Sequence, residues 1–378
     1  MFYVSKVSPF FFVVAYVNLF VSLFFKANND ILYLGLVLVY GFIFNVVLGG
    51  LYQIVPNSQS RKLNVSQVSF FVLFISLCAD LSLFLIKNFE IFAVLKFFTV
   101  LVFLIHILSV VKIVKPLTIR FIVTGLFYLF LSVLSLVSFE VFGKGSYQLS
   151  IHLFTIGVMS NLIIGVLFTW IPMLTMQVIN LKLADRFYYI YQFTSGLFLL
   201  SFLMGNHTFI TVSGIVLFFT VLFYLYIIYD SVFKGKKVIV LPVVVKYFLA
   251  GWFLFLVGVL TVLFILIFGR FDLLILHIDF MVYGFGFTIL SGAIIHLLPR
   301  IVWNWFSQQI KKSDFPNINS LVNEKLVMRL LYFYIPFLFV NVSLDYLNFL
   351  KLSVVFMFVF YVVFITLSFY RVMRYLKS

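Results

Sequence analysis

Long apolar stretches alternate with short polar connections along the whole chain. Each stretch has about 20 residues or more, enough to cross a hydrocarbon core of about 30 Å as a helix. A transmembrane β-barrel would instead show short segments that alternate between apolar and polar positions, and the sequence lacks that pattern. The pattern therefore predicts an all-α polytopic membrane protein with twelve transmembrane helices, at about 8–25, 31–55, 64–86, 90–113, 118–142, 149–178, 187–204, 208–233, 243–268, 273–298, 326–344 and 347–370.

The composition agrees with a membrane protein. Of the 378 residues, 65% are hydrophobic and 10% are charged, more apolar surface than a soluble globular domain needs. The first apolar stretch is long, lacks a small-residue cleavage site and begins a series of spans, so we interpret it as a helix and not as a signal peptide. Cys78 is the one cysteine in the sequence, which excludes a disulfide framework and a thiolate metal site.

The net charge of +15 is unevenly distributed over the predicted loops. Loops on one side hold most of the basic residues, with clusters at 234–237 and 311–312, whereas the opposite loops hold only Lys26, Lys87, Lys144 and Arg270. This asymmetry is the positive-inside signal, and it predicts that both termini are cytoplasmic, in a bacterial inner membrane. The basic residues therefore predict anionic lipid headgroups as partners, not nucleic acid.

Three segments, 40–56, 156–172 and 283–299, share one spacing of glycine and proline. A first glycine is followed eight residues later by a second and seven residues after that by a proline. The three sets are Gly41/Gly49/Pro56, Gly157/Gly165/Pro172 and Gly284/Gly292/Pro299. They fall in predicted helices 2, 6 and 10, so the helices divide into three pseudo-repeated blocks of four, about 1–115, 116–237 and 238–378, within a single transmembrane domain.

Each glycine–glycine–proline set lies on one side of its helix, because positions seven apart nearly superpose and positions eight apart are about 80° apart. Small residues let a neighbouring helix or a flat cofactor come close. Two explanations are therefore open: close helix packing, or a cofactor site lined by Gly157, Gly165, Gly284 and Gly292. The proline is expected to bend or end its helix.

Two histidines lie near the start of repeated helices. His152 precedes the first glycine of helix 6 by five residues. In helix 10, Asp279 takes that place, and His277 lies two residues earlier. An ionisable group inside a membrane is a candidate functional residue, and imidazole is a common ligand of haem iron and copper. His152 and His277 are thus candidate haem ligands, or metal ligands together with Asp279. The alternative is a hydrogen-bonded histidine near the interface.

For other polar residues in the predicted helices, a structural role is favoured over a functional one. For Asp80 in helix 3 and Glu140 in helix 5, an interhelical hydrogen bond or exposure at the outer boundary is favoured over a proton or ion path. Lys96 and His106 lie along helix 4. The sequence has no Walker loop, no His-Glu-x-x-His and no Gly-x-Ser-x-Gly, which are motifs of soluble enzymes.

The helix-10 segment 277–300, HIDFMVYGFGFTILSGAIIHLLPR, resembles the helix-10 signature of small oxidase-like and nitric-oxide-response membrane proteins. Twelve helices in three blocks of four resemble the catalytic subunit I of the haem–copper oxidases. The resemblance in topology covers the whole chain. The resemblance in specific sequence motifs covers only helices 2, 6 and 10. It implies an oxidase-like fold in which His277 binds the high-spin haem and Asp279 replaces a low-spin haem ligand.

The sequence departs from that family at the other ligand positions. Helix 2 has Leu34 and Leu36 where the second low-spin ligand is expected, and helix 7 has no histidine pair for copper. His152 alone matches the copper site, which is therefore incomplete. The resemblance implies an inner-membrane haem-binding protein with a reduced ligand set, acting in nitric oxide or oxygen metabolism or in haem or copper handling, with a redox or membrane subunit as partner.

Whether the protein is an enzyme is left open by this ligand set. If it is, the resemblance implies a haem-dependent oxidoreductase, but the incomplete low-spin haem and three-histidine copper ligands argue against oxygen reduction by the known mechanism. A cofactor-free transporter and a structural membrane subunit are the alternatives. Helix-breaking prolines and acidic residues inside the membrane favour the transporter, although transporters more often contain two repeats than three.

Overall fold

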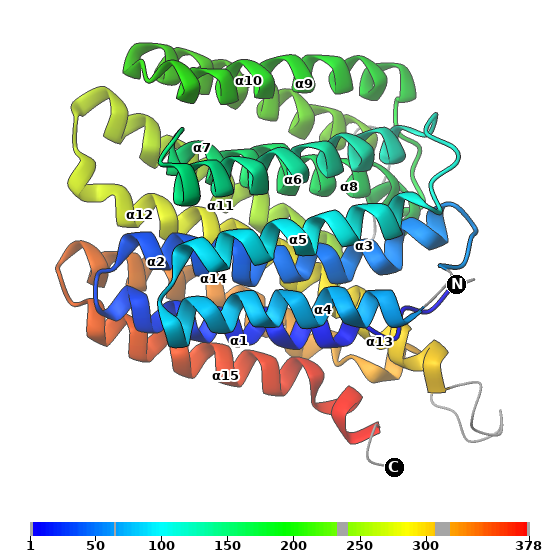
Figure 1. The fold of residues 1–378 in the computed structure, drawn as a ribbon. Helices are drawn as coiled ribbons and strands as arrows, with labels where there is room; N and C mark the ends of the chain where they lie inside the picture. The colour runs from blue at the N-terminus through cyan, green and yellow to red at the C-terminus, as the bar shows by residue number, and fades with distance from the viewer. Residues whose placement is uncertain (1–2, 64–65, 233–240, 307–317, 376–378) are drawn as a thin grey trace. The chain divides into compact units, whose positions relative to one another are not determined.

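The computed structural model describes residues 3–63, 66–232, 241–306 and 318–375, and every regular element in these ranges is helical (Figure 1). Within these described ranges, twelve helices or helix series are long and apolar enough to cross a membrane. The protein is thus an all-α integral membrane protein, as predicted. The spans are α1 (Ser8–Ala27), α2–η1–α3 (Ile31–Ser58), α4–η2 (Ser66–Ile86), α5 (Phe89–Leu108), α6 (Leu117–Phe142), α7–η3–α8 (Tyr147–Thr175), α9 (Leu181–Met204), α10 (His207–Val232), α11 (Val243–Phe268), η4–α12–η5–α13 (Phe271–Phe306), α14 (Glu324–Tyr346) and α15 (Leu350–Tyr375).

The helices form two compact units. Unit 1 contains Tyr3–Gly50 and Pro242–Ser378, and unit 2 contains Leu51–Leu241. The three repeat blocks stay a prediction, because these units divide the chain by compactness and not by repeated sequence. Each unit is described by itself below.

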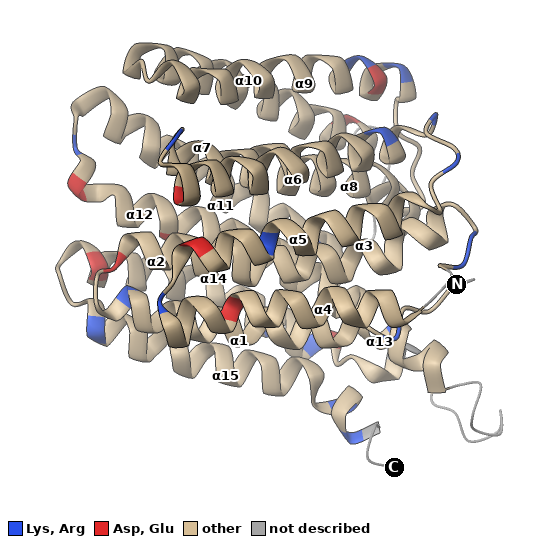
Figure 2. Cartoon of the chain, in the orientation of Figure 1, with Lys and Arg blue, Asp and Glu red and all other residues tan. Residues whose placement is uncertain are grey.

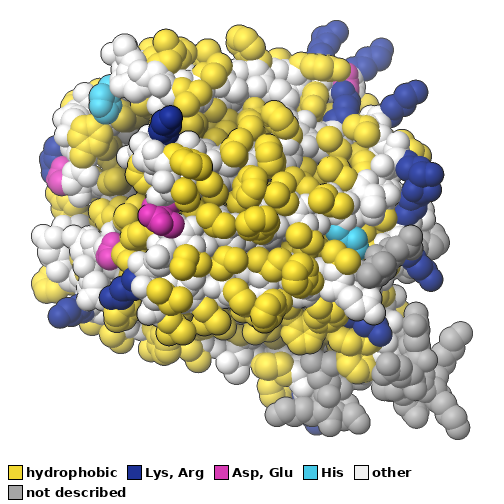
Figure 3. Space-filling model, in the orientation of Figure 1, with side chains coloured by type: hydrophobic (Ala, Val, Ile, Leu, Met, Phe, Trp, Pro, Cys, Tyr) yellow, Lys and Arg dark blue, Asp and Glu magenta, His cyan; other side chains and the backbone are white. Residues whose placement is uncertain are grey.

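The surface is that of a protein surrounded by lipid. Hydrophobic side chains cover most of the face in Figure 3, and Leu85 and Ile105 are 77% and 76% exposed. Lipid tails are as apolar as these side chains, so their exposure in a bilayer carries no penalty. Charged positions are concentrated near helix ends and connections (Figure 2). The basic clusters at 234–237 and 311–312 lie outside the described residues.

All three copies of the glycine repeat contain a π-helical stretch that includes the first glycine. The stretches are η1 (Val37–Ile43), η3 (Leu153–Ser160) and η5 (Asp279–Gly286). In the first two copies an asparagine side chain donates to the carbonyl of that glycine, Asn45 to Gly41 and Asn161 to Gly157, both at 2.7 Å. π-helical turns are rare and often mark functional sites. The repeat thus includes a backbone feature that the glycine–proline spacing did not predict.

The repeated glycines also pack in the same register. In each case the glycine pair lies against the helix that precedes it in the chain, at positions seven residues apart. The pairs are Gly41 and Gly49 against Asn18 and Phe11 of α1, Gly157 and Gly165 against Tyr128 and Phe121 of α6, and Gly284 and Gly292 against Leu254 and Tyr247 of α11. Gly284 also lies against Leu338 of α14, which is nearer to it than Leu254. Close helix packing, one of the two explanations for the glycines, therefore accounts for all three pairs.

The repeated prolines lie inside their helices. α3 ends at Ser58, just after Pro56, and α8 ends at Thr175, just after Pro172. α13 (Phe287–Phe306) instead continues well past Pro299, so of the two expected outcomes, a bend or an end, the helix end does not occur in this copy. Arg300 Nη1 donates to the carbonyl of His296 at 2.7 Å, which supplies a hydrogen bond in the turn that the proline interrupts.

Substituting Gly292 with alanine is expected to destabilise the protein by about 1–3 kcal/mol, the usual cost of overpacking. The new Cβ would lie 2.7 Å from Tyr247 Cβ. The control is Gly50→Ala, because no atom lies within 4 Å of a Cβ built there. Thermal unfolding in detergent measures both changes, and equal unfolding temperatures for the two variants would contradict this packing.

Candidate functional site

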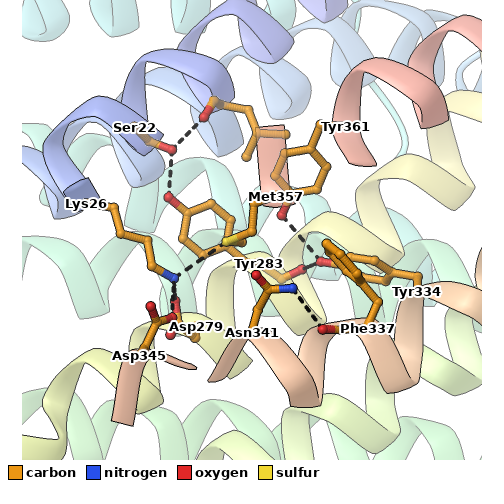
Figure 4. Close-up of polar contacts among 11 residues, drawn as sticks. Ser22, Lys26, Asp279, Tyr283, Tyr334, Phe337, Asn341, Asp345, Met357 and Tyr361 are labelled. Carbon is orange, nitrogen blue, oxygen red and sulfur yellow. Dashed lines mark hydrogen bonds and ion pairs between the residues drawn. The ribbon is translucent and has the colours of Figure 1, made fainter. Parts of the chain in front are cut away.

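Unit 1 contains a buried cluster of three ionisable side chains from three helices (Figure 4). Lys26 lies near the end of α1, Asp279 begins η5, and Asp345 lies near the end of α14. The ammonium of Lys26 pairs with Asp279 Oδ1 and lies 2.8 Å from Asp345 Oδ2. All three side chains are 0–1% exposed. The cluster is thus sealed within the protein.

The charges of this cluster do not balance. One ammonium faces two carboxylates, so the fully ionised cluster carries one excess negative charge. The two carboxyl groups also lie close enough to interact with each other. A buried charge is costly unless it is paired and hydrogen-bonded. The cluster can therefore accept one further monovalent cation, either a proton or a metal ion.

Aromatic and polar groups surround the Lys26 ammonium. The ring centroid of Tyr283 lies 4.9 Å from Nζ, and Met357 Sδ lies 3.6 Å from it. Tyr283 Oη is 2.8 Å from Ser22 Oγ, and Tyr334 donates to the Tyr283 carbonyl. These contacts hold Tyr283 and Lys26 together beside the two carboxylates.

Helical spacing explains how the sequence builds this site. Asn18, Ser22 and Lys26 are four residues apart along α1 and are each at most 1% exposed, so they form one buried polar stripe. Asn341 precedes Asp345 by one turn of α14, is 1% exposed, and its Oδ1 has no hydrogen-bond partner. The polar stripes of α1 and α14 thus bring Lys26 and Asp345 into contact range of each other and of Asp279.

Two of the three cluster residues were missed by the sequence analysis. Lys26 was assigned to an outer loop, which is wrong: it belongs to α1 and is 1% exposed. Asp345 lies one residue beyond the end of the predicted helix 326–344. The available signal was the spacing of Ser22 and Lys26, since two polar residues one turn apart inside an apolar helix indicate an interior-facing stripe.

Unit 2 has a separate buried ion pair. Lys96 Nζ of α5 lies 2.8 Å from Asp80 Oδ1 of α4 and donates to Ser76 Oγ at 3.0 Å. The interhelical interpretation of Asp80 is therefore confirmed. One ammonium meets one carboxylate, so this pair is neutral, unlike the cluster in unit 1.

The two candidate haem ligands lie in different units. His277 Nδ1 is 2.9 Å from the Gly258 carbonyl in unit 1. In unit 2, His152 Nδ1 is 2.8 Å from the Gln148 carbonyl and its ring stacks on Phe202, with centroids 4.4 Å apart. A joint site is thus not tested, and the haem and copper predictions stay predictions.

The candidate metal set is also not assembled within either unit. Asp279 Oδ1 pairs with Lys26, not with a histidine. Among the residues that the structure describes, no group of three His, Cys, Asp or Glu side chains is placed to hold a metal ion. Aromatic side chains pack on Gly157, Gly165 and Gly292, which are the glycines expected to accommodate a macrocycle. We therefore derive no chemistry from a haem or copper.

Fold and cluster together define a class: a polytopic helical membrane protein with a buried, charge-imbalanced ionic site. No family model matches the chain. A protein of Aquifex aeolicus (strain VF5) with the name "Uncharacterized protein" is 39% identical over 330 residues, which are 86% of this chain and 86% of the relative. The chain belongs to the same family as that protein.

Proposed function

We propose that the protein is a membrane transport protein that carries a monovalent cation, a proton or sodium, through unit 1 by way of Lys26, Asp279 and Asp345. The observation that carries this proposal is the charge imbalance of a fully buried cluster. It corresponds to the transporter alternative that the sequence left open.

The cost of burying these charges supports a functional role. Charged side chains inside membrane proteins are rare, and they commonly mark ion pathways and proton relays. A purely structural pair needs one carboxylate for each ammonium, as Lys96 and Asp80 have. Asp279 and Asp345 share one ammonium, so the second carboxylate adds burial cost without a positive charge of its own to balance it. A transported cation supplies that partner while it occupies the cluster.

Each residue of the cluster then has a distinct role. Asp279 and Asp345 provide the oxygen atoms that bind the cation. Lys26 holds the two carboxylates together when the cation has left, and its ammonium lowers their affinity enough for release. Met357 and the Tyr283 ring lie against the ammonium and exclude bulk water from it.

The proposal also includes the arrangement of the helices in three blocks and the orientation of the protein in the membrane. The three glycine pairs in one register support three blocks of four helices, arranged as in subunit I of the haem–copper oxidases. The uneven distribution of basic residues supports cytoplasmic termini in a bacterial inner membrane. In that orientation the cluster lies towards the outer ends of α1 and α14.

Ion flux into proteoliposomes tests the function. Purified protein is reconstituted with a potassium gradient and valinomycin, and uptake is followed by an internal pH-sensitive dye in one arm and by ²²Na⁺ in the other. Uptake in one arm above that of protein-free liposomes is the expected result. If neither ion enters faster than in protein-free liposomes, the cluster is structural and the proposal is wrong.

The haem prediction has its own test, which is independent of flux. If His152 or His277 binds haem, the reduced-minus-oxidised visible spectrum of the purified protein has a Soret and an α band, and the band weakens in His152→Ala or His277→Ala. The absence of a haem band after expression with abundant haem would contradict that prediction. Whether or not a haem band is found, transport is decided by the flux assay alone.

A further inference from the structure

We propose that the transported cation is a proton, and that hydroxyl side chains between α1 and the η5–α13 helix carry it between the Lys26–Asp279–Asp345 cluster and the middle of the bundle. This inference rests on the proposed function and names its substrate. The residues that form the path are Ser22, Tyr283, Thr288, Tyr16 and Ser291.

The first link lies beside the cluster. The Tyr283 side chain interacts electrostatically with both Asp279 and Asp345, and its ring packs on the Lys26 ammonium. Its hydroxyl is 2.8 Å from Ser22 Oγ. Ser22 in turn donates to the Leu19 carbonyl, one turn further from the cluster. The Tyr283 ring thus lies against the cluster and its hydroxyl meets Ser22, and in the proposed path this hydroxyl receives the proton from the carboxylates and passes it to Ser22.

A second hydroxyl pair lies deeper along the same two helices. Tyr16 Oη of α1 is 3.3 Å from Ser291 Oγ of α13. Thr288 lies between Tyr283 and Ser291 in sequence, is fully buried, and its Oγ1 has no hydrogen-bond partner. A buried hydroxyl of this kind is a site where an internal water binds. In the proposed path, an internal water bound at Thr288 connects the two pairs.

Polar side chains continue on the neighbouring helix α15. Ser353 Oγ and Ser368 Oγ are both buried and have no hydrogen-bond partner, and Tyr361 Oη is 3.4 Å from Tyr334 Oη. α15 packs against α1, α13 and α14. Buried hydroxyl groups therefore also occur on the helix that packs against α1, α13 and α14, although most buried side chains of these helices are apolar.

This path is suited to protons and not to sodium. A hydroxyl accepts a proton on its oxygen and releases its own, so a proton crosses a chain of hydroxyls and leaves each one unchanged after it reorients. A metal cation needs several oxygen ligands at every point of its route. Single hydroxyl pairs such as Ser22 with Tyr283 provide two oxygens and no ring of carbonyls or carboxylates.

The experiment is the proton arm of the flux assay with a matched pair of tyrosine variants. Tyr283→Phe removes the hydroxyl next to the cluster and keeps the ring, and it is expected to slow proton uptake about 10²-fold, the lower range for a positioned proton-transfer group. The control is Tyr191→Phe: Tyr191 is also buried, 1% exposed, but belongs to unit 2 and donates to the Ile156 carbonyl, so it lies off the path. Its uptake rate is expected to stay at the wild-type value.

The outcomes separate the path from the function. If Tyr283→Phe, Ser22→Ala and Tyr191→Phe all transport protons at the wild-type rate while Asp345→Asn does not, the function holds and the path is wrong. If the wild type moves ²²Na⁺ and no protons, the assignment of the proton is overturned. If it moves neither ion, the proposed function and the path both fail.

Discussion

Replacing Lys26 with methionine is expected to destabilise the protein by about 3–5 kcal/mol, the cost of removing one partner of a buried ionic group. Asp279 and Asp345 would then face each other, both fully buried, without the ammonium that lies between them. We expect a lower unfolding temperature in detergent and a smaller yield of folded protein.

Two further variants make this result specific. Lys351→Met removes an exposed lysine of α15, and its effect should stay within about 0.5 kcal/mol, as for most surface changes. Adding Asp279→Asn and Asp345→Asn to Lys26→Met removes every charge of the cluster and should restore most of the lost stability. An unfolding temperature of Lys26→Met equal to that of the wild type would contradict the structure of the cluster.

Replacing Asp345 with asparagine is expected to reduce cation flux about 10²-fold or more, in the range for loss of a positioned proton-transfer group. The change keeps the size of the side chain and removes the excess negative charge, which leaves Lys26 paired with Asp279 alone. One ammonium and one carboxylate form a neutral pair, so the variant should fold. It has no excess negative charge to bind the transported cation.

Asp272→Asn is the matched control for Asp345→Asn. The Asp272 side chain is 59% exposed and pairs with Arg270 at the surface. Its replacement removes one carboxylate of unit 1 without touching the buried cluster, so flux should remain at the wild-type rate. Equal flux in Asp345→Asn and Asp272→Asn would show that the cluster carries no cation.

The positions of the helices were predictable from hydropathy alone. The predicted spans 8–25, 118–142 and 243–268 correspond to α1, α6 and α11 within a few residues. Two predicted bounds were wrong: the span 187–204 begins six residues after the start of α9 at Leu181, and the span 273–298 ends eight residues before α13 ends at Phe306. A membrane span must satisfy its backbone hydrogen bonds internally, so an apolar stretch of sufficient length becomes a helix with little influence from its neighbours. The face of each helix on which the repeated glycines lie was also predictable, because it depends only on their spacing along the helix.

The ionic cluster could not be predicted in the same way, because its three residues are far apart in sequence. Lys26 looked like a loop residue, since a lysine at the end of an apolar stretch usually reaches the interface. Its burial depends on Asp279 and Asp345, whose helices come together only in the folded unit. The π-helical turns were hidden for a related reason: each depends on the contacts of a helix, and composition does not distinguish a π turn from an α turn.

The most direct test of the cation site is the infrared spectrum of the purified protein, where a protonated carboxyl has a C=O stretch that shifts when hydrogen is exchanged for deuterium. Two carboxylates and one ammonium predict one such proton in the wild type. The band should disappear in Asp345→Asn and also in Asp279→Asn, because the remaining carboxylate is balanced by Lys26, and it should persist in Asp80→Asn. A wild type without the band, or a band that survives in both cluster variants, would contradict the account.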